Sequence, residues 1–170
     1  MRTLLLIDFG NVDSAGLVSH ALERRFGFDT TRVQAPLPEV HRRGWQASAD
    51  DMLSDVCRLR VENKADLALG FTDADIFVPE LNFVFGLASK DGACAVVSTQ
   101  RLREKDSRLL EERLQKEAVH ELGHVLGLEH CDDRKCAMHF SNTLADTDTK
   151  GSEFCKKCSS QLEGLLRDRA

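Results

Sequence analysis

Short apolar runs alternate with amphipathic stretches along the first hundred residues of the chain. A short apolar run bounded by turn residues is typical of a buried strand, whereas apolar residues that recur every three or four positions predict a helix. The resulting order is strand, helix, strand, helix and then three further strands. We expect the strands at residues 4–8, 31–35, 67–71, 82–88 and 93–98, and the helices at residues 14–26 and 49–61.

Polar residues mark where these two helices begin. Asp13 or Ser14 can cap the first helix with a side-chain oxygen. Ser48, with Asp51 three positions later, resembles a capping box, in which two side chains and two backbone N–H groups bond reciprocally. Both helices are therefore expected to start on local capping residues.

The order of the elements also predicts the topology of the sheet. Alternating strands and helices favour parallel strands joined by crossovers. The turn sequence Lys-Asp-Gly at residues 90–92 is too short for a crossover, so it implies one antiparallel strand. We expect this strand, at residues 82–88, to lie at an edge of the sheet.

A longer helical pattern covers residues 106–126, where apolar residues recur every four positions. At 1.5 Å per residue this helix is about 30 Å long, and Gly127 is placed to end it. The pattern then fades until a closing helix at residues 155–166. Residues 131–151 contain too few apolar side chains to fold on hydrophobic burial alone.

Composition places the chain among ordinary globular domains, with 170 residues, 42% hydrophobic and 30% charged. The net charge of -5 argues against nucleic acid or an anionic membrane as a partner. The apolar run at residues 4–7 is too short for a signal peptide, and none of the apolar runs approaches the ~20 residues of a membrane span. We therefore expect a cytoplasmic monomer that does not bind membranes.

Six cysteines and six histidines are the unusual part of this composition. In a cytoplasmic protein, clustered cysteines bind metal more often than they form disulfides. Cys57 and Cys94 are not clustered and lie within apolar patterns, so we expect two small, reduced core residues.

Three of the histidines follow a metal-binding pattern. His120, Glu121 and His124 form H-E-x-x-H within the long helix. Histidines four residues apart lie about 40° apart around a helix, so both can reach one metal ion. A single histidine on a helix is as readily a hydrogen-bonded, partly buried residue, but two further residues extend the pattern. After Gly127, which can turn the chain sharply, His130 completes H-E-x-x-H-x-x-G-x-x-H.

This donor set predicts a catalytic zinc site. Structural zinc sites take four protein ligands, whereas catalytic sites keep one position open for water. Zinc held by three neutral imidazoles lowers the pKa of its water towards ~7, and Glu121 is placed to take the proton as general base. The chain contains no tyrosine, so no phenol can assist with the oxyanion. The arrangement predicts hydrolysis of an amide bond, most naturally in a peptide.

Four cysteines predict a second zinc site, which is structural. They form two pairs, C-x4-C and C-x2-C, separated by 18 residues. A closed thiolate shell would fasten the apolar-poor stretch to the last helix. Seven basic and seven acidic residues between 131 and 170 give no electrostatic attraction for phosphate, which argues against a nucleic-acid-binding ribbon. The four ligands are Cys131, Cys136, Cys155 and Cys158.

Met138, two residues after Cys136, matches the Met-turn of metzincin peptidases, in which a methionine packs below the three histidines. With it, the whole run from His120 to Cys158 resembles the archaemetzincin family: H-E-x-x-H-x-x-G-x-x-H-C-x4-C-x-M, then C-x-x-C. Sixteen residues separate Met138 from Cys155, one fewer than the family's usual spacing. Looser similarity lies upstream, at Arg43, Gln46 and residues 82–86.

The resemblance implies a minimal metzincin fold of class α+β, in one catalytic domain at residues 1–170. An α/β-like upper subdomain, residues 1–127, would hold a twisted mixed sheet of about five strands and the active-site helix. A lower subdomain, residues 128–170, would hold the third histidine, the Met-turn and the cysteine site. An extended peptide would pair with the edge strand above the cleft. This strand supplies Asn82, Phe83, Val84, Phe85 and Gly86, although the two phenylalanines could equally pack in the core.

We therefore expect a zinc metallopeptidase with two zinc ions per chain and a peptide or protein substrate. An alternative is a zinc-binding module that binds peptides with little or no turnover. A third hypothesis, a zinc-stabilised interaction protein, requires the three histidines to bind no metal. Glu121 favours the peptidase, because a site that only holds metal does not need it.

Overall fold

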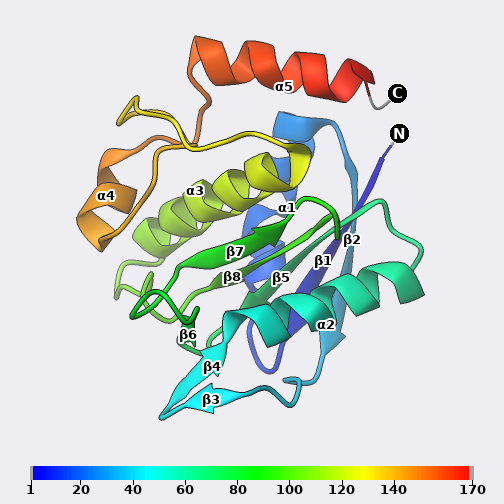
Figure 1. The fold of residues 1–170 in the computed structure, drawn as a ribbon, viewed down its shortest axis with the longest axis vertical. Coiled ribbons are helices and arrows are strands. Elements are labelled where there is room, and N and C mark those ends of the chain that lie inside the picture. The colour runs from blue at the N-terminus through cyan, green and yellow to red at the C-terminus, as the bar shows by residue number, and fades with distance from the viewer. Residues whose placement is uncertain (1, 169–170) are drawn as a thin grey trace.

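A mixed five-stranded sheet forms the centre of the computed structural model, which describes residues 2–168 (Figure 1). Met1 and residues 169–170 of the predicted domain lie outside the described residues. The strand order is β2-β1-β5-β8-β7, with only β7 antiparallel to its neighbour. The predicted mixed sheet with one antiparallel edge is confirmed. The strands are β1 (Thr3–Phe9), β2 (Asp29–Ala35), β5 (Leu67–Thr72), β7 (Gly86–Ser89) and β8 (Cys94–Ser98).

Helices cover both faces of this sheet. Alternate residues of β1 point to opposite faces: Leu4 and Leu6 belong to one apolar cluster and Leu5 and Ile7 to another. The first cluster contains residues of α1 and α3, and the second contains residues of α2. The three predicted helices are therefore confirmed as α1 (Ser14–Phe26), α2 (Ala49–Glu62) and α3 (Ser107–Leu126).

The start of α2 is only half of the predicted capping box. Ser48 Oγ accepts the backbone N–H of Asp51 at 3.2 Å, as expected. The Asp51 carboxylate, however, accepts the N–H of His41 at 2.7 Å. It therefore holds the preceding loop rather than closing the box.

The start of α1 differs from the prediction. Asp13 occupies the capping position but makes no capping hydrogen bond. The carboxylate of Asp8, at the end of β1, accepts the N–H groups of Ser14 and Ala15 at 2.9 and 3.1 Å instead. The cap thus comes from the neighbouring strand, and it ties the helix to the sheet.

The edge strand is shorter than predicted, since β7 begins at Gly86 and not at residue 82. The N–H of Val84 donates to Ile76 O at 3.0 Å, in an isolated bridge. Side chains from other elements bind the carbonyl groups of Leu81 and Asn82. Backbone groups occupied in this way are not available to the β8 ladder, so residues 82–85 form a loop that leads into the strand.

A second, three-stranded sheet lies beside this loop and was not predicted. It contains β3 (Arg42–Arg43), β4 (Gln46–Ser48) and β6 (Ile76–Phe77). Strands of two or three residues are too short to produce a hydrophobic alternation in the sequence.

The apolar-poor segment contains a short helix, α4 (Leu144–Thr149), which the sequence pattern did not predict. Both α4 and the expected closing helix, α5 (Lys156–Asp168), pack against α3 (Figure 1). Arg113 of α3 binds both carboxylate oxygens of Asp148, at 2.7 and 2.8 Å. An ion pair thus helps to attach this segment to α3, where the segment has few apolar side chains for packing. None of the helices in the described part of the chain has the length and hydropathy of a membrane span.

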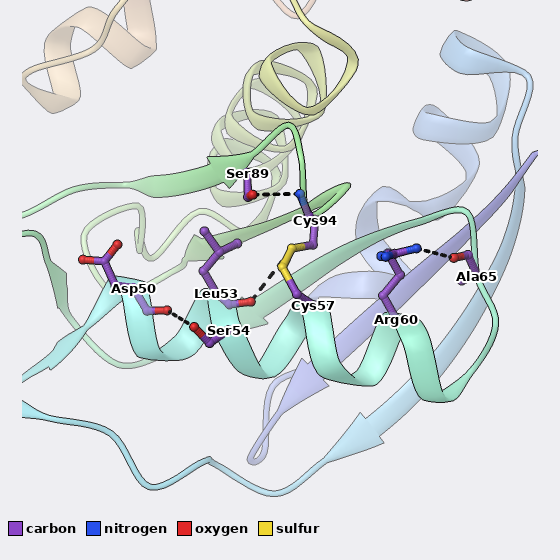
Figure 2. The surroundings of a disulfide bond; sticks show 9 residues. Asp50, Leu53, Ser54, Cys57, Arg60, Ala65, Ser89 and Cys94 are labelled. Atoms are coloured by element: carbon purple, nitrogen blue, oxygen red, sulfur yellow. Dashed lines mark hydrogen bonds between the residues drawn. A yellow bond between two sulfur atoms is a disulfide. The ribbon is translucent and has the colours of Figure 1, made fainter. Parts of the chain in front are cut away.

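The prediction that Cys57 and Cys94 are reduced is wrong, because the structure joins them in a disulfide (Figure 2). Cys57 lies on α2 and Cys94 begins β8, and their Cα atoms are 5.5 Å apart, within the range that disulfides require. Cys94 is fully buried, as expected. The bond links α2 covalently to the sheet that it covers.

This disulfide predicts the number of titratable thiols. In denaturant with a metal chelator and no reductant, a thiol-specific reagent should detect the four free cysteines, and all six after reduction. Closing a loop across 37 residues should raise the free energy of unfolding by about 3–5 kcal/mol relative to Cys57→Ala/Cys94→Ala. Detection of six thiols before reduction would contradict the assignment.

Candidate active site

His120 and His124 lie one turn apart on α3, with their rings oriented by backbone carbonyl groups. His120 Nδ1 is 2.8 Å from Ala137 O, and His124 Nδ1 is 2.8 Å from Leu128 O. Because a carbonyl oxygen only accepts, Nδ1 carries the proton in each neutral ring and Nε2 carries a lone pair. The two Nε2 atoms are 3.1 Å apart. Two lone pairs at this distance repel each other, so the geometry suits a cation between them.

His130 lies with this pair. Gly127 ends α3 with φ +108°, a left-handed conformation that glycine adopts without strain. The His130 ring centroid lies 4.7 Å from that of His124 and 5.4 Å from that of His120. Potential ligand atoms of all three residues lie within 4.8 Å of one another. Tetrahedral Zn–N bonds of ~2.0–2.1 Å place nitrogens about 3.3 Å apart, so this donor set fits one zinc ion.

Burial keeps the two helical imidazoles neutral, the form that binds a metal. It lowers the pKa of His120 well below its ordinary value, and it also lowers the pKa of His124. These two rings are therefore already neutral near pH 7, and a cation can bind without first displacing protons from them.

Glu121 lies beside the histidines and against the edge strand. A Cβ atom placed on Gly86 would be 2.5 Å from Glu121 Oε1, so the carboxylate fills the space that the glycine leaves. Burial, and then the negative charge of Glu117, raises the pKa of Glu121 to about 8, while Lys150 opposes the shift. A cation held by the neighbouring histidines would favour the ionised carboxylate and so lower this pKa again.

A buried ion pair lies next to Glu121. Lys150 Nζ is 3.1 Å from Glu117 Oε1, and Thr147 Oγ1 donates to the same oxygen at 2.9 Å. Lys150 Nζ also donates to His139 O at 3.5 Å. Lysine is almost never this buried, at 1% exposed, without a partner. The pair offsets the second carboxylate of the site and ties α3 to residues 139–150.

Met138 packs directly against α3 at Gly123, the residue before His124. A Cβ atom placed on Gly123 would contact Met138 Sδ, and it would lie 3.1 Å from Met138 Cε. Met138 is fully buried, and its carbonyl accepts the N–H of Cys131 at 3.0 Å. The methionine therefore packs against the helix that carries the two histidines, and its part as a Met-turn stays a prediction.

The four clustered cysteines form a second group, and their sulfur atoms lie within 4.8 Å of one another. Cys131 Sγ and Cys155 Sγ are 3.8 Å apart, the separation that tetrahedral Zn–S bonds of ~2.3 Å produce. The backbone N–H of Cys158 is the main cause that lowers the pKa of Cys155 to about 7, which favours a thiolate. This donor set fits a closed zinc site.

A cleft of about 180 Å³ opens beside the three histidines. One wall is formed by residues 81 and 83–87 and the other by residues 140–142. Four of the five residues predicted to meet substrate, residues 83–86, line this cleft. Asn82 does not line it, because Arg43 and Gln46 hold its carbonyl group behind the wall.

The model of peptidase family M54 matches residues 27–164. The chain belongs to peptidase family M54. The resemblance to archaemetzincins is thereby confirmed. An archaemetzincin of Pyrococcus furiosus is 46% identical over 114 residues, which cover 64% of this chain and 59% of that relative. The chain thus spans about 60% of the length of the first curated relatives that it matches.

Solved structures of similar proteins agree with the fold over nearly the whole chain. The crystal structure of archaemetzincin from Methanopyrus kandleri has a TM-score of 0.90 at 36% identity, covering 98% of this chain and 96% of that one. A structure described as a zinc-dependent peptidase, from Methanocorpusculum labreanum, has a TM-score of 0.82 at 28% identity. It covers 94% of this chain and 99% of that one. The predicted fold class is confirmed.

Several residues of this M54 site were not found from the sequence. Glu117 lies four positions before Glu121, so helical spacing could have placed it in the same cleft. No sequence pattern pointed to Lys150 or to residues 140–142. Their position beside the site depends on how the chain folds after Met138, which local spacing does not predict. Within the described residues, Ser141 Oγ is buried without a hydrogen-bond partner, although Ser141 lines the cleft.

The buried pair predicts a large effect on stability. Lys150→Met leaves the Glu117 carboxylate without its cation, and the free energy of unfolding should fall by about 3–5 kcal/mol in denaturant titrations. Lys135→Met is the control, because its exposed ammonium group reaches Thr149 O at only 3.4 Å. It should lose about 1 kcal/mol or less. Adding Glu117→Gln to Lys150→Met should recover much of the loss, and equal losses in the two lysine variants would contradict the assignment.

Proposed function

We propose that this M54 protein is a zinc-dependent peptidase. The observation that carries the proposal is the pair of facing Nε2 atoms of His120 and His124, 3.1 Å apart and both acceptors. His130 would complete a three-nitrogen zinc site and leave one position for water. The similar protein from Methanocorpusculum labreanum, described as a zinc-dependent peptidase, supports this activity.

Glu121 is the proposed general base. A bound zinc ion supplies Lewis acidity, which lowers the pKa of a water ligand and polarises the carbonyl group of the substrate. The Glu121 carboxylate accepts the proton of the attacking water and delivers it to the leaving amine. Its burial against Gly86 keeps bulk water away from the proton that it carries.

The free edge of β7 (Gly86–Ser89) is the proposed binding edge for the substrate backbone. This strand ends the five-stranded sheet, so its outer backbone groups have no strand partner among the described residues. An extended peptide can add to such an edge through main-chain hydrogen bonds.

The remaining parts of the proposal concern the whole chain. Cys131, Cys136, Cys155 and Cys158 would hold a second, structural zinc ion. Residues 1–127 and 128–170 would act as upper and lower subdomains of one catalytic domain, with the cleft between them. We also propose a cytoplasmic monomer that acts on peptides or proteins and binds neither nucleic acid nor membranes.

Metal content and turnover together test this function. Zinc-replete protein should contain two zinc ions per chain, measured by inductively coupled plasma mass spectrometry. His124→Ala should lose one ion and keep the fold, whereas Cys131→Ser should lose the other ion and the fold with it. Glu121→Ala should keep both ions and lose cleavage of a quenched-fluorescent peptide library.

Three outcomes would overturn parts of the proposal. Normal cleavage by Glu121→Ala removes the role of Glu121 as general base. Two bound zinc ions with no cleavage by the wild type, but with peptide binding, would instead support a peptide-binding module. One zinc ion or none under zinc-replete conditions counts against the peptidase.

Gly86 should also be required for turnover. The Cβ of Gly86→Ala would lie 2.5 Å from Glu121 Oε1 and 2.8 Å from its Cδ, so the carboxylate must move. A shift of about 1 Å in a catalytic group can cost on the order of 100-fold in kcat/KM, and zinc content should not change. Gly164→Ala is the control, because no atom lies within 4 Å of the added Cβ. Wild-type turnover in Gly86→Ala would show that Glu121 is not held as proposed.

A further inference from the structure

The loop before β7 forms one wall of the cleft and is held by side chains from distant parts of the chain. The Arg43 guanidinium group donates to Leu81 O at 3.0 Å and to Asn82 O at 2.8 Å. Gln46 Nε2 donates to the same Asn82 oxygen at 2.8 Å. Two consecutive carbonyl groups are therefore fixed from behind, and the residues after them are presented to the cleft.

These anchors belong to one connected network. Gln46 Nε2 also donates to Asp75 Oδ2 at 3.1 Å, and both of these residues are buried. Asp75 in turn binds Arg101 through both carboxylate oxygens, at 2.7 and 2.8 Å. A bidentate pair of this kind fixes the plane of the guanidinium group as well as its position.

Arg101 places that plane against Phe83. Its guanidinium carbon lies 3.9 Å from the centroid of the Phe83 ring, well within the range of a cation–π contact. The Phe83 ring also meets the buried ring of Phe85 edge to face, with centroids 5.3 Å apart. Phe83 itself is only partly buried and lines the cleft. Phe85 is thus a core residue, whereas Phe83 is an oriented ring with surface left for a ligand.

The opposite wall carries a second aromatic ring. Phe140 is 45% exposed, and its ring centroid lies 5.1 Å from that of His130. Of the residues that line the described cleft, only Glu117 and Glu121 carry a charged side chain, and Glu117 is paired with Lys150. The volume of about 180 Å³ is below the roughly 300–1,000 Å³ of pockets that enclose a whole small ligand. It suits one side chain of a longer molecule.

We propose that Phe83 and Phe140 form a subsite for one bulky apolar side chain of a peptide, aromatic or long aliphatic. Arg101 is a positioning residue, which acts by holding the ring of Phe83. This inference rests on the proposed function, since it names the class of peptide that the same cleft accepts. The apolar walls select against a charged side chain at this position, because such a side chain would lose its hydration there without gaining a partner.

Binding to the inactive enzyme tests the subsite without requiring turnover. Zinc-loaded Glu121→Ala is titrated, by fluorescence anisotropy, with alanine-based peptides that carry one Phe, Leu, Ala or Asp at each position in turn. At one position, the Phe and Leu peptides should bind at least tenfold more tightly than the Ala peptide, and the Asp peptide least tightly. Phe83→Ala and Phe140→Ala, each in this background, should reduce the preference for Phe over Ala about tenfold. Leu17→Ala, at an exposed apolar residue of α1 outside the cleft, should not change it.

Arg101 is tested in the active enzyme by its effect on selectivity. Arg101→Met should raise KM for the Phe peptide severalfold with little change in kcat, and it should reduce the preference for Phe over Ala. Arg101→Lys, which keeps the charge over the ring, should restore part of that preference. A general loss of structure would lower kcat for all peptides alike. If Arg101→Met does not fold, as judged by circular dichroism, Phe83→Leu serves instead, and it should shift the preference from Phe towards Leu.

The outcomes separate this subsite from the proposed function. Equal binding of Ala and Phe peptides, or an unchanged preference in Phe83→Ala, overturns the subsite even if the wild type cleaves peptides. The predicted preference in binding, with no cleavage by the wild type, supports the subsite and overturns the peptidase.

Discussion

Two backbone carbonyl groups, those of Leu128 and Ala137, determine how the helical histidines present their nitrogens. Each accepts a hydrogen bond from the Nδ1–H of one imidazole and so turns the Nε2 lone pair of that ring towards the same point. Leu128 reaches its place because the chain reverses at Gly127, directly after α3. Ala137 reaches its place between Cys136 of the cysteine cluster and Met138 under the helix. The turn at Gly127 therefore places the carbonyl group of Leu128 beside α3, and the cysteine cluster and Met138 together place that of Ala137.

The segment after this turn is held by charge where it lacks apolar side chains. Lys150 contacts acceptors from two places, Glu117 on α3 and the carbonyl of His139. Arg113 and Asp148 add a bidentate pair one turn further along α3. Buried ion pairs contribute little net stability, because desolvation offsets most of the attraction. Their directional partners, however, allow only one register between the segment and the helix, and the walls of the cleft depend on that register.

Features that depend on residues close together in the chain could be predicted from the sequence, and features that depend on remote contacts could not. The three large helices, the five strands and the histidine pattern were predictable, because their periods and spacings lie within about twenty residues. The start of β7, the disulfide from Cys57 to Cys94, and the place of Lys150 depend on partners that are remote in the chain. Asp51 is an example: its spacing from Ser48 fits a capping box, yet its carboxylate accepts the N–H of His41, and the N–H of Ser48 donates to His41 O instead.

The two walls of the cleft are built on different principles. The wall at residues 140–142 belongs to the segment that the cysteine cluster and the buried ion pairs hold in place. In that segment the side chains themselves make the holding contacts, so their identities matter. The wall at residues 81 and 83–87 is held differently, because Arg43 and Gln46 bind the backbone carbonyl groups of residues 81 and 82. Any amino acid at these two positions would offer the same carbonyl groups. Substitutions at Phe83 can therefore alter which side chain the cleft accepts without loosening the loop that carries it.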